Sequence, residues 1–266
     1  MDVVSGYLNR LKIDREKPSL NYLQRLIQHH LSFIPYETFS KFHYYNQGDQ
    51  HVPDFDVFVQ HLEERGWGGT CYSLNINFSR LLQRLGFTCA FVRVLPGHAA
   101  IMVTIENSRY YVDVGYGSPM TRPIELESRH RHVLHGFGEE IIFTNQGEKK
   151  FLLERRANGK TFVTKEIHWM PLTEAEIIEE AVSSFQDHDG NLTMRRISAV
   201  RFQGNNCYFL RDETLKVINY RGIRAHHFKE KETWLKAVAE AFQVNEQGLE
   251  ESIVFLEQRG VKLFEK

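Results

Sequence analysis

The sequence predicts an α+β fold with a helical N-terminal part, a strand-rich middle and a mixed C-terminal part. Apolar residues recur at helical spacing up to Gly86, and short runs of β-branched and aromatic residues separated by turn residues follow it. After residue 230 the helical spacing returns. A chain of 266 residues lies in the range where a single core begins to split, so we expect two or three domains.

Two helices are indicated before Gly86. Ser19 is a candidate N-cap for a segment that ends near Pro35, and Thr70 is a candidate N-cap for a second segment that stops at Gly86. Both segments carry an apolar stripe with spacings of three and four residues: Leu20, Leu23, Ile27 and Leu31 in the first, and Leu74, Phe78, Leu81, Leu82 and Leu85 in the second.

Strands and hairpins are predicted after Gly86. Glu106-Asn107-Ser108 reads as one hairpin turn, and Asn158-Gly159 is the strongest short hairpin signal in the chain. The expected strands are 89–95, 98–105, 109–115, 139–144, 150–156, 160–167, 206–211 and 214–219. Two further helices are expected around Trp234 and around Ile253.

The composition excludes several classes of protein. Thirty-three Lys and Arg balance 34 Asp and Glu, so we expect neither a non-specific nucleic-acid partner nor an anionic membrane partner. No apolar run approaches the roughly 18 residues of a membrane span, and the first ten residues lack the features of a secretory signal.

The cysteine and histidine content bears on location and on metals. Three cysteines in a long chain do not suggest a disulfide framework, so free thiols in a reducing cytoplasm are expected. His130, His132 and His135 crowd together, but no Cys or carboxylate lies at zinc-site spacing. We therefore expect a solvated turn there and no metal site.

The segment Gly66-Trp67-Gly68-Gly69-Thr70-Cys71 delivers a cysteine to the first turn of an amphipathic helix. Unpaired N–H groups and the helix dipole at that position favour the thiolate. Glycines allow backbone or substrate to approach the sulfur closely. Cys71 is therefore a candidate nucleophile, and the alternative is a buried structural cysteine at a helix start.

A cysteine nucleophile needs an imidazole to take its proton and a carboxylate to orient that imidazole. His98 lies 27 residues after Cys71, on the face of its strand opposite the apolar one. Asp113 lies 15 residues further, in the partner strand of the same hairpin, where an unpaired carboxylate would be costly. The order Cys71, His98, Asp113 predicts a catalytic triad.

These residues lie in motifs that resemble the arylamine N-acetyltransferase family. The similarity covers roughly residues 1–130 well and the remainder in outline. The matching motifs are Ile34-Pro35-Tyr36-Glu37, Gly68-Gly69-Thr70-Cys71-Tyr72-Ser73-Leu74-Asn75, His98, Tyr111-Val112-Asp113-Val114-Gly115-Tyr116-Gly117 and Arg122-Pro123-Ile124-Glu125-Leu126.

The resemblance implies both a fold and a reaction. The fold would be a helical domain carrying the nucleophile (1–86), a β-barrel domain carrying His and Asp (87–190) and an α/β lid (191–266). The reaction would be acetyl transfer from acetyl-CoA, a co-substrate and not a bound cofactor, to the nitrogen of arylamines or arylhydrazines. Cys71, His98 and Asp113 would be the catalytic triad.

Two further residues receive expectations from the resemblance. Tyr116 either lines the acceptor pocket or packs inside the barrel. Gly97 stands where bacterial members of the family carry a longer loop that approaches the CoA pyrophosphate.

The sequence departs from the family pattern at three points. Trp67 replaces the arginine of the family's Arg-Gly-Gly motif, which leaves Arg65 as the nearest arginine to reach Glu37. Ser73 replaces a Glu or Gln, and only Pro96-Gly97 precedes His98. We therefore expect weak use of free acetyl-CoA, since phosphates need N–H groups, Lys or Arg.

Two alternatives stay open. A cysteine-dependent amide synthase would keep the triad and use a non-CoA acyl donor, and a catalytically weak relative would bind aromatic ligands. A papain-like peptidase is excluded, because its Cys-to-His spacing is roughly 130 residues or more.

Overall fold

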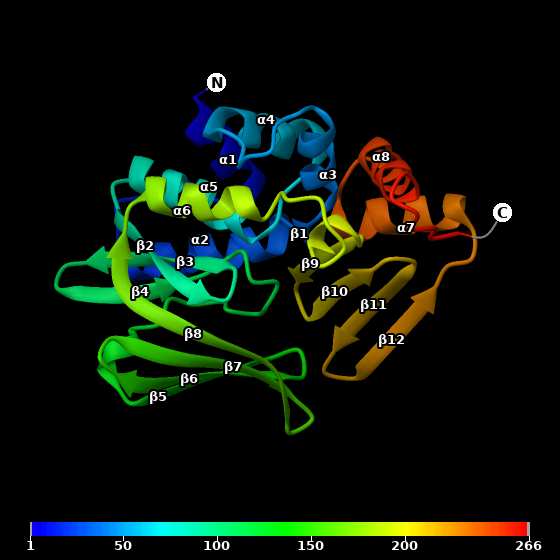
Figure 1. Cartoon of the computed structure of the whole chain (residues 1–266). Coiled ribbons are helices and arrows are strands. Elements are labelled where there is room, and N and C mark those ends of the chain that lie inside the picture. Colours follow the sequence, from blue (N-terminus) through cyan, green and yellow to red (C-terminus); the bar gives the residue numbers. More distant parts are fainter. Residues whose placement is uncertain (1, 265–266) are drawn as a thin grey trace.

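The computed structural model describes residues 2–264, and its N-terminal third is helical (Figure 1). Ser19 caps the second helix by accepting a hydrogen bond from the Tyr22 amide at 3.1 Å, as the sequence predicts. Among the described residues, no helix combines the length and the apolar character needed to cross a bilayer. The helices of this part are α1 (Val3–Leu11), α2 (Leu20–Phe33), α3 (Phe39–Asn46), α4 (Phe55–Arg65) and α5 (Cys71–Arg84).

A seven-stranded antiparallel sheet forms the middle of the chain and curls beneath α5 (Figure 1). Its strand order is β4-β3-β2-β8-β7-β6-β5, so the predicted barrel takes the form of a curled sheet with β4 and β5 at its edges. The strands are β2 (Thr88–Leu95), β3 (His98–Ile105), β4 (Ser108–Val112), β5 (Arg131–Gly136), β6 (Glu139–Gly147), β7 (Lys150–Ala157) and β8 (Lys160–Leu172).

A second antiparallel sheet, in the order β1-β9-β10-β11-β12, forms the lid region together with two helices. Its first strand comes from the N-terminal third, because Tyr36 pairs with Val200 and Glu37 with Ala199. The elements are β1 (Tyr36–Glu37), β9 (Ser198–Gln203), β10 (Asn206–Arg211), β11 (Thr214–Asn219), β12 (Gly222–His227), α7 (Lys231–Phe242) and α8 (Glu246–Glu257).

A short connecting region joins the two sheets. α6 (Glu174–Ser183) packs on α5 and β2, and the 3-10 turn Leu192–Met194 follows it. Another 3-10 turn, Leu126–Ser128, lies between β4 and β5.

Apolar side chains of α5 and β3 share one core with α1, α2 and α4. The two elements that begin with Cys71 and His98 are thus fixed against the same packed interior.

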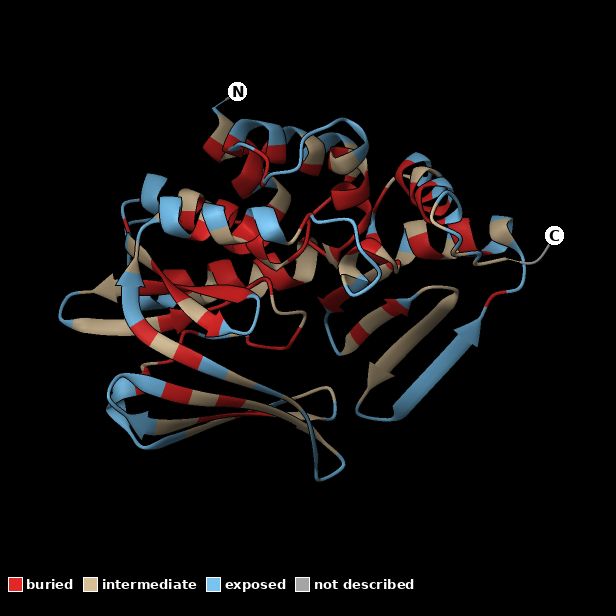
Figure 2. Ribbon diagram, in the orientation of Figure 1, coloured by how far each residue is buried: buried red, intermediate tan, exposed pale blue. Residues whose placement is uncertain are grey.

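The predicted α+β class is confirmed, but the sequence did not indicate helices α1, α3, α4 and α6 or strands β1, β5, β9 and β12. His132 and His135 lie in β5 with His130 just before it, where the sequence suggested a turn. Asp113 directly follows β4, which ends at Val112. Strand β12 is exposed along its whole length, so its residues lack the apolar pattern that would have indicated a strand (Figure 2).

The expected domain boundaries fall between elements. The one at 86/87 separates α5 from β2, and the one at 190/191 lies after α6. The pairing of β1 with β9 joins the first and last parts. Independent domains at these positions stay a prediction.

Candidate active site

Cys71 is the first residue of α5, and Thr70 occupies the N-cap position without a side-chain capping bond. The first hydrogen bond of the helix runs from the Leu74 amide to the Thr70 carbonyl at 3.0 Å. The N–H groups of the first turn have no acceptor within the helix and point past its start. Cys71 is partly exposed, whereas the next residues of α5 are buried. The sulfur therefore lies at the positive end of the helix dipole.

The glycines around Cys71 allow three backbone segments to touch. A Cβ at Gly68 would lie 1.9 Å from the Pro35 carbonyl oxygen, and one at Gly115 would lie 2.6 Å from the Cys71 carbonyl oxygen. Gly69 has a φ of 148°, which favours glycine. A side chain at any of these positions would displace the segments that hold the cysteine.

His98 and Asp113 form a buried pair beside Cys71. The ring nitrogen Nε2 of His98, at the start of β3, lies 2.6 Å from Oδ2 of Asp113. The Asp113 carboxylate also accepts hydrogen bonds from the Tyr111 hydroxyl at 3.0 Å and the Gly115 amide at 3.0 Å. The side chains of His98 and Asp113 are 3% and 0% exposed. The structure thus brings together the three residues that the sequence singled out.

Asn75 connects the helix to this pair. Its side-chain amide donates to Asp113 Oδ1 and to the Ala99 carbonyl, both at 2.9 Å, and its oxygen accepts from the Val114 amide at 3.0 Å. Asn75 lies four residues after Cys71, which places it on the same helix face. Asn75 was not anticipated as a site residue, although that spacing and its place in the matched motif were signals.

The electrostatics favour an ion pair between Cys71 and His98. Burial would raise the pKa of the Cys71 thiol, but its hydrogen bond with His98 and the positive charges of His98 and Lys41 bring it below the ordinary value. Burial would lower the pKa of His98, but the charge and hydrogen bond of Asp113, followed by those of Cys71, raise it to about 9. Both shifts favour a thiolate paired with an imidazolium.

A hollow of about 300 Å³ opens beside Cys71, and we call it the polar hollow. Gly97, in the turn between β2 and β3 with a φ of 65°, lies in its wall. Lys41 of α3 lies in the same wall and was not anticipated from the sequence, because nothing in the local pattern distinguishes it from a surface lysine. The polar hollow is defined by Lys41, Cys71, Gly97, His188, Asn191 and Thr193.

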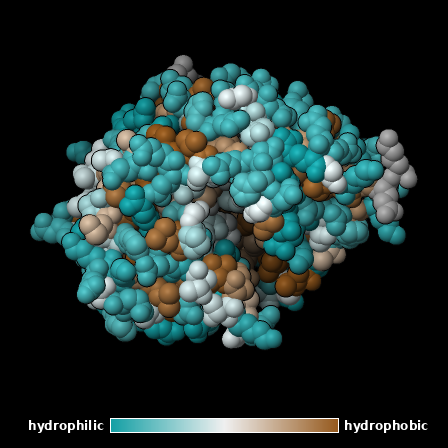
Figure 3. Space-filling model, in the orientation of Figure 1, coloured by the Kyte–Doolittle hydropathy of each residue, from teal (hydrophilic) through white to brown (hydrophobic). Residues whose placement is uncertain are grey.

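A second hollow of about 580 Å³ lies between the curled sheet and the lid sheet, and we call it the aromatic hollow. The Tyr116 ring lies 4.7 Å from the His98 ring, centroid to centroid, and connects this hollow to the triad. Figure 3 shows brown, apolar side chains beside a hollowed part of the surface in this view. The aromatic hollow is defined by Tyr36, Tyr116, Phe137, Phe202 and Phe209.

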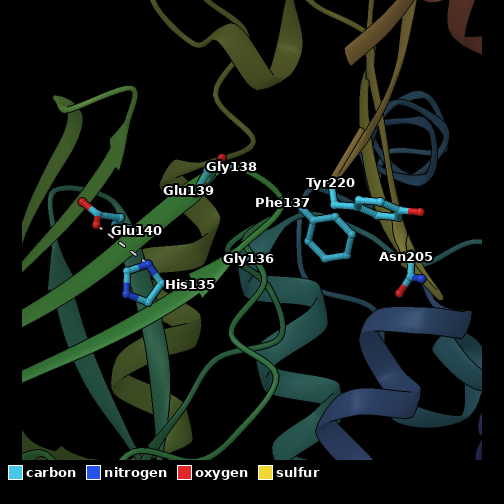
Figure 4. Close-up of a pocket in the computed structure, with 8 residues that line it drawn as sticks. All are labelled: His135, Gly136, Phe137, Gly138, Glu139, Glu140, Asn205 and Tyr220. Carbon is cyan, nitrogen blue, oxygen red and sulfur yellow. Dashed lines mark ion pairs between the residues drawn. The ribbon is translucent and has the colours of Figure 1, made fainter. Parts of the chain in front are cut away.

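A third hollow, next to the aromatic hollow, is drawn in Figure 4. This space of about 590 Å³ shares Phe137 and Glu139 with the aromatic hollow. The Phe137 and Tyr220 side chains face the same opening from the two sheets, while Glu140 pairs with His135 at 3.8 Å on the other side of the strand. A flat aromatic molecule could therefore enter from solvent between the two sheets.

Arg65, the nearest arginine that could have reached Glu37, does not contact it. Arg65 packs over the Trp67 ring at 4.5 Å and lies 3.9 Å from the Glu251 carboxylate. Glu37 instead accepts hydrogen bonds from the Ser40 amide at 2.9 Å and the Ser40 hydroxyl at 2.7 Å. Trp67 is buried, and its indole lies against Gly248.

Comparison with known proteins gives a consistent assignment. A family model described as N-acetyltransferase matches residues 19–249. Proansamycin X synthase of Amycolatopsis mediterranei (strain S699) is 30% identical over 198 residues, which are 65% of this chain and 72% of that protein. Human arylamine N-acetyltransferase 1 is 27% identical over 141 residues, 47% of each chain, so the match spans about half the length of this relative.

Solved structures share the fold over nearly the whole chain. The arylamine N-acetyltransferase of Mycobacterium smegmatis has a TM-score of 0.80 at 24% identity and covers 97% of this chain and 98% of its own. The Mycobacterium marinum enzyme in complex with CoA has a TM-score of 0.80 at 19% identity and covers 96% and 98%.

Proposed function

Because the chain belongs to the arylamine N-acetyltransferase family, we propose that it transfers an acetyl group from a thioester to the nitrogen of an arylamine or arylhydrazine through an acyl-cysteine at Cys71. One observation carries the proposal. The buried His98–Asp113 pair, 2.6 Å apart, holds an imidazolium against a cysteine at a helix N-terminus. This arrangement supplies a nucleophile, a proton carrier and a group that orients the carrier.

In the first half-reaction the Cys71 thiolate attacks the thioester carbonyl carbon and a new carbon–sulfur bond forms. The carbonyl oxygen gains negative charge and faces the N–H groups of the first turn of α5. The bond to the donor sulfur then breaks, and the leaving thiolate takes the proton of the His98 imidazolium. Acyl-Cys71 and neutral His98 result.

In the second half-reaction an amine nitrogen attacks the acyl-Cys71 carbonyl. His98 takes the N–H proton, the Cys71–carbon bond breaks, and the amide product leaves a thiolate beside an imidazolium. Asp113 keeps His98 in one orientation and stabilises its positive charge in both steps. The two half-reactions together predict a ping-pong mechanism.

The two hollows support different roles in this reaction. The aromatic hollow, with Tyr116 over His98, suits the flat ring of an arylamine. The polar hollow, with Gly97 in its wall, suits the donor. Free acetyl-CoA is expected to be a weak donor, because the turn before His98 offers only Pro96 and Gly97 to the phosphates. Three free cysteines are consistent with a cytoplasmic location.

A second candidate is an amide synthase that uses a non-CoA acyl donor. The observation that favours it is that a relative 30% identical to this chain is named a synthase and not an acetyltransferase. The triad chemistry would be the same, and only the group that carries the acyl chain would differ. A catalytically weak relative that binds aromatic ligands would form no acyl-enzyme at all.

Intact-mass measurement separates these functions. The protein is incubated with acetyl-CoA, with acetyl-N-acetylcysteamine, or with p-nitrophenyl acetate, and an arylamine is then added. We expect one acetyl group on Cys71 that disappears as the acetylated amine forms. Acylation by the short thioester but not by acetyl-CoA would favour the amide synthase. A protein mass that stays unchanged with every donor would contradict covalent catalysis. The Cys71→Ser variant, which lacks the thiol, is the control.

A further inference from the structure

Lys41 is a buried cation beside the nucleophile. It is 2% exposed, lies on α3 and lines the polar hollow together with Cys71. Its ammonium group donates to the Ser184 carbonyl and to the Thr193 hydroxyl, both at 2.6 Å. A lysine at this depth is rare unless its charge is paired.

The protein supplies neutral partners only. The two acceptors are a carbonyl and a hydroxyl, and among residues 2–264 no carboxylate forms an ion pair with Lys41. An ammonium group has three N–H donors, and beside these two acceptors the Lys41 ammonium meets only the face of the Phe185 ring, 5.0 Å from its centroid, among the described residues. Burial lowers the pKa of Lys41 to about 8, partly offset by the Cys71 thiolate, so the charge persists at neutral pH.

The wall of the polar hollow carries polar side chains next to Lys41. Hydroxyl, amide and imidazole side chains of Thr193, Asn191 and His188 surround the space next to Lys41. The Thr193 hydroxyl already donates to Asn191, and the Asn191 amide already donates to the Ser184 and Gln186 carbonyls, so Lys41 is the cation that a ligand would meet there. A methyl group would leave the Lys41 ammonium without a counter-ion, whereas a carboxylate would form a charge-assisted hydrogen bond with it.

We propose that the polar hollow is the acyl pocket and that Lys41 selects donors whose acyl chain ends in a carboxylate, that is, thioesters of dicarboxylic acids. This inference rests on the proposed acyl transfer at Cys71. The thioester carbonyl lies at Cys71 while the distal carboxylate reaches Lys41, and the amine approaches from the aromatic hollow. The transfer chemistry is unchanged, and only the acyl group differs.

A phosphate of CoA is the other anion that could meet Lys41, and the experiment separates the two sources. Succinyl and succinamoyl groups have the same shape, but only the first carries a charge. Each is presented on CoA and on N-acetylcysteamine, which has no phosphate. Rates of Cys71 acylation are measured by intact mass for the native protein and for two variants.

Lys41→Met removes the charge and keeps an unbranched chain. Lys165→Met is the matched control, because Lys165 on β8 donates to the Pro96 carbonyl and lies outside the wall of the polar hollow. The succinyl-to-succinamoyl ratio, taken on one preparation, is independent of the fraction of folded protein. The native protein and Lys165→Met should prefer succinyl roughly 10- to 100-fold on both carriers, and Lys41→Met should lose this preference.

Each other outcome overturns the inference. If Lys41→Met lowered the rate of Cys71 acylation only with the CoA donors, Lys41 would be assigned to a phosphate of CoA. If Lys41→Met lowered the acylation rate equally with all four donors, the role of Lys41 would be to hold α3 against residues 184–193. Acylation of the native protein without a succinyl preference would refute the acyl pocket and leave the proposed function standing. No acyl-Cys71 with any donor would refute both.

Discussion

Two carboxylates are buried near the loop that leads to Cys71, and their surroundings differ. Asp113 accepts hydrogen bonds from Asn75, Tyr111 and Gly115 and faces His98 at 2.6 Å. Glu37 accepts from Ser40 and meets no cation among the described residues. Burial raises the pKa of Glu37 to about 7, because hydrogen bonds alone offset only part of its desolvation.

The two acids differ in whether a group that can carry a positive charge lies beside them. A neighbour that can carry a positive charge turns Asp113 into part of an ion pair, and that pair in turn raises the pKa of His98 to about 9. Neutral donors hold Glu37 in place without securing its charge. Asp113, which has His98 beside it, is therefore suited to a role in catalysis. Glu37, which has no cation beside it, is suited to holding the loop that leads to Cys71.

The variant with the largest expected effect tests whether acyl transfer takes place at Cys71, next to the His98–Asp113 pair. Cys71→Ala should lower acyl transfer by about 10⁴-fold or more, because the nucleophile is lost. Cys207→Ala is the control, since that thiol lies in β10, where burial raises its pKa to about 12. The measurement is steady-state transfer to an arylamine. Retained turnover in Cys71→Ala, or an acyl group on Cys207, would contradict the assignment.

Asp113→Asn sharpens the comparison by giving His98 a neutral partner like those of Glu37. The pKa of His98 should fall and the pKa of Cys71 should rise, so the midpoint of alkylation against pH should move up toward the value of free cysteine, about 8.5. Transfer should fall roughly 10²- to 10⁴-fold. A native Cys71 that already titrates like free cysteine would refute the ion pair.

Glu37→Gln should alter stability more than catalysis. The pKa of Glu37 is higher in the fold than its ordinary value of 4.5, so its ionisation destabilises the protein as pH rises from about 4.5 and the penalty is complete above about 7. The variant should gain about 3 kcal/mol relative to the native protein between pH 4.5 and 9. Urea unfolding at several pH values measures this, and a pH-independent difference would mean that Glu37 is charged throughout.

Tyr116→Phe gives the smallest effect and decides between the two roles considered for this residue. Its hydroxyl is buried and has no hydrogen-bond partner among the described residues. If it meets the acceptor amine, the KM for an arylamine should rise roughly 3- to 10-fold while Cys71 acylation stays unchanged. An unchanged KM together with a higher Tm would assign Tyr116 to packing.

The sequence was sufficient to single out the three residues that the structure brings together, because each has a local signal, and their role as a catalytic triad stays a prediction. Glycines before a helix start mark Cys71, and strand alternation places His98 and Asp113 on one hairpin. Strand ends were less accurate: Asp113 lies just outside β4, since pairing with β3 ends at Val112.

Other residues depend on contacts between distant segments and had no local signal. Lys41 becomes a buried cation only because residues 184–193 fold over α3. Arg65 turns to Glu251, nearly 190 residues away, because Trp67 fills the space toward α8. Such choices are set by tertiary packing, which neither periodicity nor propensity encodes.

The two-residue strand β1 has a consequence for the order of assembly. The Glu37 amide donates to the Gly69 carbonyl at 3.0 Å and the Thr38 amide to the Ser198 carbonyl at 3.1 Å, so one short segment touches both the nucleophile loop and the lid sheet. Its lid partner is translated about 160 residues later, and closing so long a loop carries an entropic cost. On the ribosome, we therefore expect a nascent chain to leave the Cys71 loop unsecured until β9 has emerged.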